Sequence, residues 1–164
     1  MKTLFAPWRI HFIEDLRERT GGCVFCEVAA ASPDLDEKNL VLYRGETAYV
    51  VMNKYPYISG HLLVIPCKHS GSLSDLSDEE RSEIMKLSAL SIDIISEALE
   101  ADGFNCGFNL GRAAGAGIVD HVHLHVVPRW VGDNNFLPVL GDTRSIPEYL
   151  ERTYQKLVGS FKKI

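Results

Sequence analysis

The apolar residues of the chain follow two periods, about two residues in short stretches and about 3.6 residues in longer ones. Five short stretches, rich in Val, Leu, Ile and aromatic residues, predict β-strands. These strands span 40–43, 47–52, 61–66, 106–110 and 121–128. Arg44-Gly45-Glu46 separates the first two strands and predicts a hairpin. The short connection is typical of neighbouring antiparallel strands.

The clearest helical period lies in the middle of the chain. Apolar residues recur at helical spacing from Ile84 to Leu99. Ser77 and Glu80 have the spacing of a capping box, in which each side chain accepts the other residue's backbone N–H. We expect Gly103 to act as the C-cap. The pattern therefore predicts a long helix over 78–100.

Shorter helical patterns occur towards both ends of the chain. Residues 23–31 predict a helix that Ser32-Pro33-Asp34 ends. A last helix with one apolar stripe is predicted to begin near Ser145, where Glu148 completes a second capping box. The first 22 residues carry aromatic and then charged side chains, and we expect an arm with a short helix there.

Together these elements predict the α+β class, with an antiparallel sheet of about five strands and two main helices. The chain has 164 residues, of which 46% are hydrophobic, so it is long and apolar enough to form a core. We expect a single domain over 1–164. Its parts are an N-terminal arm (1–22), a core (23–130) and a C-terminal extension with a helix (131–164).

Composition and charge narrow the range of partners. The net charge is -5, which makes general binding to a nucleic-acid backbone unexpected. No apolar run approaches the roughly 18 residues of a membrane span, so we expect no membrane partner. The first residues include Trp8, Arg9 and His11, where a signal peptide would need its apolar region. These features predict a cytoplasmic protein.

Three of the six histidines alternate with apolar residues in the last predicted strand, as His121, His123 and His125. Strand side chains alternate between two faces, so the three imidazoles are expected on one face. One interpretation is a row of solvent-facing histidines, which the strict alternation disfavours. The second is a catalytic metal held by two or three of them. The third is an imidazole nucleophile whose neighbours set its tautomer and supply protons. Periodicity alone does not separate the last two.

The loop before this strand consists almost entirely of glycine and alanine, in Gly111-Arg112-Ala113-Ala114-Gly115-Ala116-Gly117. Without bulky side chains, backbone N–H groups approach a phosphate closely. The loop is not a Walker loop, because no Gly-Lys-Ser/Thr follows, and it leads into a strand, unlike a dinucleotide-binding turn. Its position shortly before the aligned histidines favours phosphate chemistry.

The four cysteines are Cys23, Cys26, Cys67 and Cys106. The first two have Cys-x-x-Cys spacing, which indicates half of a metal site or a redox dithiol. The remaining ligands of a zinc site would come from Cys67, His69 or the histidines at 121–125. A framework of disulfides is not expected in a reducing compartment. The two later cysteines are otherwise expected to be buried thiols.

The histidine strand resembles the signature of the histidine triad (HIT) family, in which three histidines alternate with apolar residues. Gly60-His61-Leu62-Leu63-Val64-Ile65-Pro66 is similar to a second motif of that family, and Asn53 falls where the family carries Asn or Asp. These matches cover residues 23–130. Beyond them, the segment 128–136 resembles the bacterial branch of diadenosine polyphosphate phosphorylases and hydrolases. The resemblance implies a HIT-like fold and a homodimer.

The resemblance also implies the chemistry. Family members bind a nucleotide with its α-phosphate above the histidines, and the central histidine attacks phosphorus. His123 would then form a nucleotidyl-histidine intermediate, which phosphate or water resolves. His125 would contact the phosphoryl oxygens or the leaving group, His61 would complete the cluster, and His121 would orient His123. No metal is needed at phosphorus in this scheme.

Substrate contacts implied by the resemblance lie on several elements. Asn53 would bind the ribose hydroxyls, and the backbone amides at 115–117 would stabilise charge on the α-phosphate. Apolar residues would line the cleft for the base, and Trp130 would stack on a second base. The implied contact residues are Asn53, Asn109, Gly115, Ala116, Gly117, Phe25, Val51, Leu63 and Trp130.

Many bacterial family members with a Cys-x-x-Cys near the start bind zinc. The resemblance therefore implies a closed, structural Zn²⁺ site, since two thiolates and two imidazoles suit a tetrahedral ion. Its ligands would be Cys23, Cys26, His69 and His121.

The favoured function is cleavage of dinucleoside polyphosphates, above all diadenosine tetraphosphate, with phosphorolysis preferred to hydrolysis. An adenosine 5'-phosphoramidase would use the same intermediate with a small amine as the leaving group. A nucleotide-binding regulatory module with weak catalysis is the alternative from another class. The substrate is in each case an adenine nucleotide or a dinucleoside polyphosphate.

Overall fold

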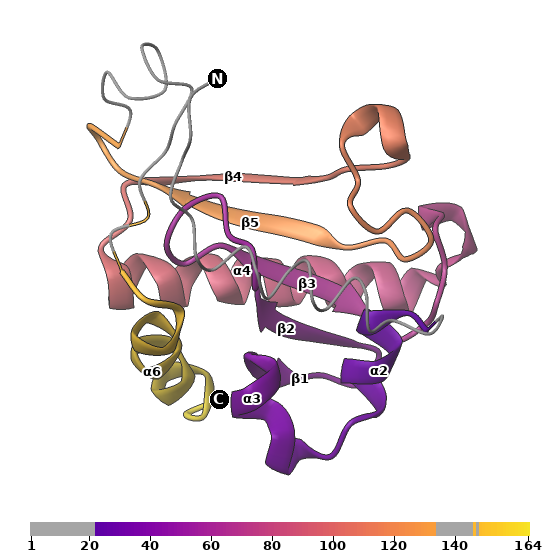
Figure 1. The fold of residues 1–164 in the computed structure, drawn as a ribbon, viewed down its shortest axis with the longest axis horizontal. Coiled ribbons are helices and arrows are strands. Elements are labelled where there is room, and N and C mark those ends of the chain that lie inside the picture. Colours follow the sequence, from indigo (N-terminus) through magenta and orange to yellow (C-terminus); the bar gives the residue numbers. More distant parts are fainter. Residues whose placement is uncertain (1–21, 134–145, 147) are drawn as a thin grey trace, which may run out of the picture.

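The computed structural model of the chain describes residues 22–133, 146 and 148–164. Five strands form one antiparallel sheet in the order β1-β2-β3-β5-β4 (Figure 1). The strands are β1 (Val41–Arg44), β2 (Ala48–Met52), β3 (Leu62–Pro66), β4 (Gly103–Phe108) and β5 (Leu124–Arg129). The α-helices of the described part are α2 (Val24–Ala30), α3 (Asp36–Asn39), α4 (Asp78–Leu99) and α6 (Leu150–Phe161). The predicted α+β class and its antiparallel sheet of five strands are confirmed.

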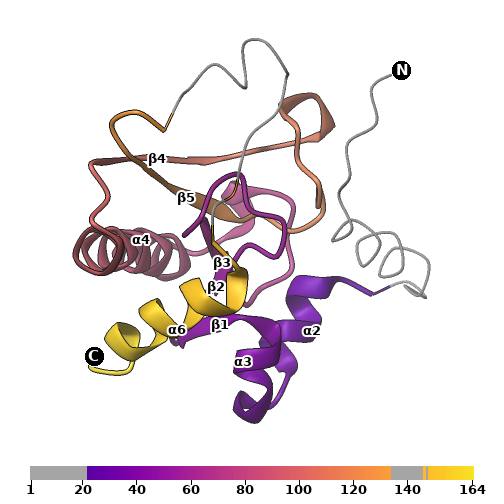
Figure 2. The ribbon, with the colours of Figure 1, turned by 60° about the vertical axis from the view of Figure 1, so that its left-hand side comes forward.

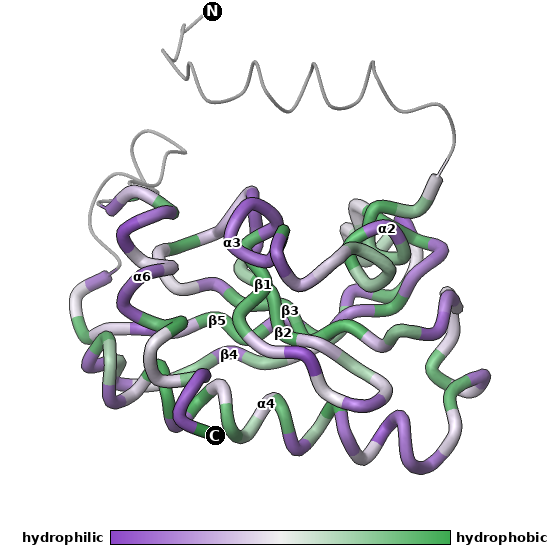
Figure 3. Tube along the Cα trace, turned by 90° about the horizontal axis from the view of Figure 1, so that it is seen from below, coloured by the Kyte–Doolittle hydropathy of each residue, from purple (hydrophilic) through white to green (hydrophobic). Residues whose placement is uncertain are grey.

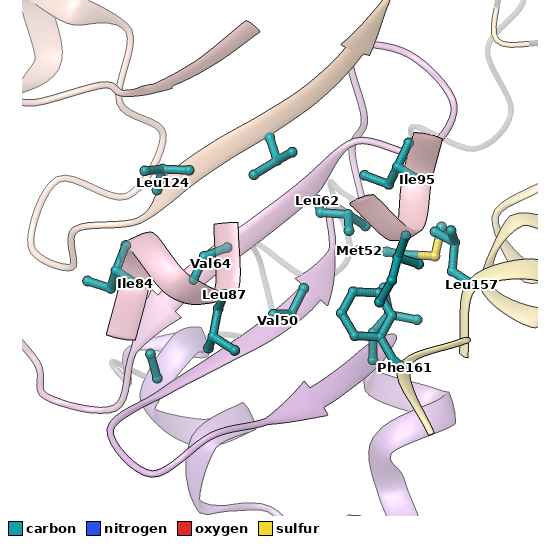
Figure 4. Packing of buried hydrophobic residues seen from close by; sticks show 14 of the residues in the cluster. Val50, Met52, Leu62, Val64, Ile84, Leu87, Ile95, Leu124, Leu157 and Phe161 are labelled. Atoms are coloured by element: carbon teal, nitrogen blue, oxygen red, sulfur yellow. The ribbon is translucent and has the colours of Figure 1, made fainter. Parts of the chain in front are cut away.

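The two faces of the sheet bury different sets of side chains. One face packs against α4 and α6, which lie next to each other beside the sheet (Figure 2). In Figure 4, Val50, Val64 and Leu124 of the strands meet Ile84, Leu87 and Ile95 of α4, with Leu157 and Phe161 of α6 closing one end. The other face carries Tyr49, Val51, Leu63 and Ile65 and packs against Phe25 of α2.

The central strands are hydrophobic along their length, whereas the helices alternate hydrophobic and hydrophilic residues (Figure 3). This difference follows from burial, since every residue of β2 and β3 is buried between helices on both faces. Helix α4 presents only one side to the core, and its opposite side includes the exposed Met85. No helix among the described residues is long and apolar enough to cross a membrane.

The capping box at the start of α4 is confirmed. The Glu80 N–H donates to Ser77 Oγ at 3.2 Å, and the Ser77 N–H donates to Glu80 Oε2 at 2.7 Å. The prediction that Gly103 caps the other end is wrong, because Glu100 already has the left-handed conformation with φ 52°. The chain turns early because the Asp102 N–H donates to the Arg129 carbonyl, so pairing of β4 with β5 begins at Gly103.

Two other predicted strand boundaries differ in the same region. β4 starts three residues before the predicted 106–110 and ends at Phe108. β5 starts at Leu124, not at His121, and its pairing with β3 is limited to Leu62, Leu63 and Val64. The residues just before β5 bond elsewhere, and the Val122 N–H donates to the Ser70 carbonyl at 2.7 Å.

Helix α6 starts later than the pattern predicts. Its first residue is Leu150 with Tyr149 at the N-cap, so a start near Ser145 is wrong. Glu148 instead accepts from the Thr153 hydroxyl at 2.8 Å and from Lys156 at 2.6 Å. Ser145, most of the predicted arm (1–21) and residues 134–145 of the extension lie outside the described residues. The short helix α3 was not predicted.

The core of α4 provides a test of this packing. Ile95 is fully buried against the sheet and α6, so Ile95→Ala leaves a cavity and should cost about 2–5 kcal/mol of unfolding free energy. Met85→Ala removes a similar side chain from the exposed side of the same helix and is expected to change stability by less than about 1 kcal/mol. Urea unfolding of both variants measures the difference, and equal losses would contradict the assigned faces.

Candidate active site and metal site

Three histidines meet on the sheet face that packs against α2. His125 lies in β5 opposite Leu63 of β3, and His61 directly precedes β3. His61 Nε2 lies 2.9 Å from His125 Nδ1, and the ring centroids of His123 and His125 are 4.9 Å apart. All three side chains are buried. The structure therefore brings together His61, His123 and His125, as the sequence predicts.

His121 lies on the same side but belongs to a different group. The Phe25 ring contacts both histidines, with centroids 5.4 Å from His121 and 5.0 Å from His123. The His121 imidazole, however, faces the sulfur atoms of Cys23 and Cys26. It reaches His123 only through its backbone, because the His121 carbonyl accepts from His123 Nδ1 at 2.9 Å. The orienting contact is thus made by the main chain.

This carbonyl determines the tautomer of His123. A carbonyl oxygen only accepts hydrogen bonds, so Nδ1 of His123 carries the proton. In a neutral imidazole the other nitrogen, Nε2, then has a free lone pair. Burial lowers the pKa of His123, which favours this neutral form. His123 therefore has the protonation state of a nucleophile.

One backbone donor, at His61, determines the tautomers of the other two histidines. The Tyr57 N–H donates to His61 Nδ1 at 3.1 Å, so this nitrogen carries no proton and Nε2 does. His61 Nε2–H then donates to His125 Nδ1. In neutral His125 the remaining proton is on Nε2. Asn109 Nδ2 lies 3.4 Å from this nitrogen, and the Asn109 amide accepts the N–H with its oxygen when it is turned by 180°. The pair thus ends in an N–H donor beside His123.

The pKa values of the pair favour these neutral forms. Burial, followed by the neighbouring His125 and His123, lowers the pKa of His61 to about 3. Burial and the neighbouring His123 lower the pKa of His125 to about 4. Both imidazoles therefore stay neutral across the physiological range, because charging either one requires placing a cation in a buried site beside other imidazoles.

A pH dependence of stability follows from these values. The unfolded chain protonates its histidines near their ordinary pKa of 6.5, whereas the folded chain does so only near pH 4 and 3. Between these limits the unfolded state binds more protons, so stability should fall as pH falls from about 6.5 to 4. Urea midpoints of the metal-free protein at pH 7 and pH 4.5 measure the loss. A His61→Gln, His125→Gln double variant should show a smaller loss, and an equal loss would contradict the assignment.

The predicted substrate-binding residues lie at different distances from the histidines. Asn53 Nδ2 lies 3.3 Å from His61 Nδ1, and Asn53 Oδ1 accepts the Tyr55 N–H at 2.9 Å. Val51 and Leu63 are buried on the same face of the sheet, under Phe25. Asn109 reaches the cluster directly after β4. That these five residues contact a bound nucleotide stays a prediction.

The glycine and alanine loop is already partly bonded to itself. It forms a short 3-10 helix, Arg112–Ala114, and Gly115 has φ +84°, a conformation that favours glycine. The N–H groups of Gly115 and Ala116 donate to the carbonyls of Arg112 and Gly111. Of the three amides predicted to bind phosphate, Gly117 is the one that this turn does not use.

Trp130 has a structural contact that the sequence did not indicate. Its indole N–H donates to the Leu99 carbonyl at 3.2 Å, which ties the end of β5 to the end of α4. Stacking of Trp130 on a second base stays a prediction.

Two cysteines and two histidines form a second cluster next to the first. The possible ligand atoms of Cys23, Cys26, His69 and His121 all lie within 4.8 Å of one another. Both Cys23 Sγ to His121 Nδ1 and Cys26 Sγ to His69 Nδ1 measure 3.3 Å, and the two Nδ1 atoms are also 3.3 Å apart. Around tetrahedral zinc, bonds of about 2.0 Å to N and 2.3 Å to S imply such edges of roughly 3.3–3.5 Å.

The protonation of His121 suits this use. Its Nε2–H donates to the Pro66 carbonyl at 2.8 Å, so the lone pair of Nδ1 points towards the cysteines. A second hydrogen bond of this kind is typical of metal-bound histidines, because it orients the ring. The donor set and its spacing therefore fit a zinc ion.

Contacts that sequence analysis missed hold the helix of the cysteines in place. Arg44 donates to the Val28 and Ala29 carbonyls at 3.1 and 3.0 Å and pairs with Asp36 at 2.7 Å. The buried Tyr49 hydroxyl donates to the Phe25 carbonyl at 2.8 Å. Both residues come from the hairpin of β1 and β2, which thereby anchors α2 beside the histidines.

The expectation that the two later cysteines are buried is wrong. Cys67 and Cys106 are both exposed. Cys67 follows the last residue of β3, and Cys106 lies in β4 at the edge of the sheet, where α4 does not cover it. Neither belongs to the cluster of four possible ligands.

Residues 35–131 match the family model described as the HIT domain. Over 99% of its length the chain is 37% identical to the AP-4-A phosphorylase of Mycobacterium tuberculosis, of which the match covers 86%. It is also 30% identical, over 65% of its length, to the adenosine 5'-monophosphoramidase of Schizosaccharomyces pombe, of which 74% is covered.

The fold matches a crystal structure of a zinc-bound histidine triad family protein from Mycobacterium smegmatis, with a TM-score of 0.69 and 30% identity. That match covers 87% of this chain and 94% of the other. The expected HIT-like fold is thus confirmed.

Proposed function

Because the chain belongs to the HIT family, we propose that it is an enzyme that cleaves dinucleoside polyphosphates through a nucleotidyl-histidine intermediate on His123. Diadenosine tetraphosphate is the favoured substrate, since the related Mycobacterium tuberculosis protein is named an AP-4-A phosphorylase. The proposal is supported above all by two complementary groups in the histidine cluster, one with a lone pair and one with a proton. A free lone pair on His123 Nε2 lies beside an N–H donor on His125 Nε2.

His123 and His125 have different roles in the first step, the cleavage of the substrate at the α-phosphorus. His123 Nε2 attacks the α-phosphorus, a P–N bond forms, and the bond from that phosphorus to the bridging oxygen breaks. His125 Nε2–H donates a hydrogen bond to the leaving oxygen, where negative charge develops. The His121 carbonyl holds Nδ1–H of His123, so the positive charge that appears on this imidazole stays next to an acceptor. The products of this step are ATP and an AMP group on His123.

A second attack resolves the intermediate. Inorganic phosphate would attack the same phosphorus from the vacated side and release ADP, and water would release AMP. We favour phosphate, because the sequence is similar to the AP-4-A phosphorylase along nearly its whole length. Asn53 would bind the ribose hydroxyls, and Phe25, Val51 and Leu63 would contact the base.

A product assay on diadenosine tetraphosphate tests the proposal. ADP and ATP that appear only when inorganic phosphate is present would support phosphorolysis. AMP and ATP without phosphate would identify a hydrolase of the same mechanism. Tight nucleotide binding without any turnover would contradict the enzyme and favour a binding module.

A phosphoramidase is the second candidate, and the identity with the monophosphoramidase of Schizosaccharomyces pombe favours it. It would use the same attack by His123, with an amine as the leaving group that takes a proton from the His125 side. Release of AMP from adenosine 5'-phosphoramidate, without turnover of diadenosine tetraphosphate, would identify this activity.

We propose a structural zinc ion at Cys23, Cys26, His69 and His121, supported by the fitting donor distances and by the zinc-bound relative. The ion would supply a cross-link between α2, the loop after β3 and the segment that precedes β5. We also propose a cytoplasmic location, since free cysteines such as Cys67 and Cys106 suit a reducing compartment. The net charge of -5 gives no support to a nucleic-acid partner.

We also propose a homodimer. Among the described residues no strand pairs with the outer edge of β4, and an unpaired edge is a template for another strand. β4 is also the most exposed strand of the sheet, at Asn105, Cys106 and Gly107. Sedimentation should give about twice the mass of one 18.3 kDa chain, and a single-chain mass would contradict the dimer.

A further inference from the structure

The Tyr57 ring covers the pair formed by His61 and His125. Its centroid lies 4.5 Å from that of His61, with an angle of 41° between the planes, and 5.7 Å from that of His125 at 18°. Tyr57 belongs to the loop between β2 and β3 and is 44% exposed. The two histidines, in contrast, are 1% and 8% exposed. One face of the tyrosine therefore packs on the imidazoles while the residue as a whole borders solvent.

The backbone of the same residue controls the protons of the pair. The Tyr57 N–H donates to His61 Nδ1, and the Asn53 amide group lies 3.3 Å from the same nitrogen. A backbone N–H only donates, so it selects the tautomer of His61 with the proton on Nε2. That proton in turn selects the tautomer of His125. The Tyr57 ring thus packs on the same two histidines whose hydrogen bonds the Tyr57 N–H orients.

Water would not make this selection. A water molecule both donates and accepts, so it satisfies either nitrogen of an imidazole in either tautomer. Asn53 Nδ2 also donates to His61 Nδ1, but the Tyr55 N–H of the same loop holds the Asn53 amide in this orientation through its oxygen. If the loop moved, water would replace the Tyr57 N–H and the Asn53 amide would lose its orientation, so the reversed order of protons would become accessible. His125 Nε2 would then lack its proton part of the time. The ring resists this change, because aromatic stacking fixes the loop and excludes water from the pair.

We propose that Tyr57 is a positioning residue that keeps the His61–His125 pair in the single proton order that leaves a donor on His125 Nε2. The proposal rests on the proposed function, in which that donor faces the leaving oxygen. The ring, not the phenol hydroxyl, performs this role, since the contacts with both histidines are ring contacts. Tyr57→Phe should therefore behave like the wild type, and Tyr57→Ala should not.

The direct test is nitrogen NMR of the histidine side chains in the substrate-free protein. Wild type and Tyr57→Phe should show His61 and His125 as single Nε2–H tautomers. Tyr57→Ala should show averaged signals for both residues, while His123 keeps its proton on Nδ1. Tyr55→Ala, which removes a tyrosine with 39% exposure from the same loop, serves as the matched control and should leave the signals unchanged. Unaltered signals in Tyr57→Ala would overturn the proposal.

Kinetics with diadenosine tetraphosphate and phosphate give the second readout. Tyr57→Ala should lower kcat about 10- to 100-fold with little change in KM, because a supporting contact is lost and no substrate contact. Tyr57→Phe should stay within about twofold of the wild type. A rise in KM alone, with unchanged NMR signals, would overturn the proposal in favour of a substrate contact. The NMR result stands even if no substrate is turned over, so the two proposals fail separately.

Discussion

Replacement of His123 by alanine is expected to remove turnover of diadenosine tetraphosphate and leave nucleotide binding nearly intact. The loss should be on the order of 10⁴-fold or more, because no other group offers a free imidazole lone pair at that position. His61 uses both ring nitrogens in hydrogen bonds, and His125 accepts at Nδ1 and carries its proton on Nε2. The apolar base contacts and Asn53 come from other elements, so AMP affinity, measured by calorimetry, should change little.

A rapidly quenched reaction with α-labelled substrate distinguishes a nucleophile from a residue that only binds. Label should stay on the wild-type protein through a bond that acid breaks and base does not, as expected of a phosphorus–nitrogen linkage. His123→Ala should carry no label. His125→Ala offers the matched control within the same cluster, since it should label more slowly yet still label. Label retained by His123→Ala would place the nucleophile on another histidine.

The alternation of histidines predicted the location of the site because it depends only on local geometry. His121, His123 and His125 are two residues apart, so any strand-like backbone puts them on one side. The motif around His61 likewise indicated a neighbouring strand, and the antiparallel pairing of β3 with β5 brings it alongside. The capping box of α4 was also predictable from the sequence, because it depends on local geometry and both of its residues lie within one turn.

The resemblance already assigned His121 to the zinc ligands, but the contacts that separate the two histidine clusters were less accessible to sequence. They depend on groups far away in the chain, such as the Pro66 carbonyl that bonds His121, 55 residues away. The roles of Arg44 and Tyr49 have the same origin, because they act through carbonyls of α2 that only the folded hairpin approaches. In the sequence Tyr57 is only an aromatic residue close to the His61 motif, and its stacking depends on how the loop folds back.

The second large effect is expected at the proposed zinc site. Cys26→Ala should lower the bound zinc from one ion per chain to nearly none, because three ligands hold the ion far less tightly than four. Stability should fall by several kcal/mol, since binding energy at a structural site contributes directly to folding. The loss is large here because the four ligands join three separate segments, at α2, at His69 and at His121. Metal analysis and thermal unfolding measure the two effects together.

Catalysis should fall with the metal, although the ion would not contact the substrate. The carbonyl that fixes the tautomer of His123 belongs to His121, so a displaced His121 also releases the nucleophile. A chelator should therefore reproduce the loss of stability and rate in the wild type and add nothing to Cys26→Ala. Cys106→Ala is the matched control, because this exposed cysteine lies in β4 outside the cluster and its removal should leave zinc, stability and metal dependence unchanged. A wild-type protein that contains no zinc and unfolds at the same temperature with and without chelator would contradict the site.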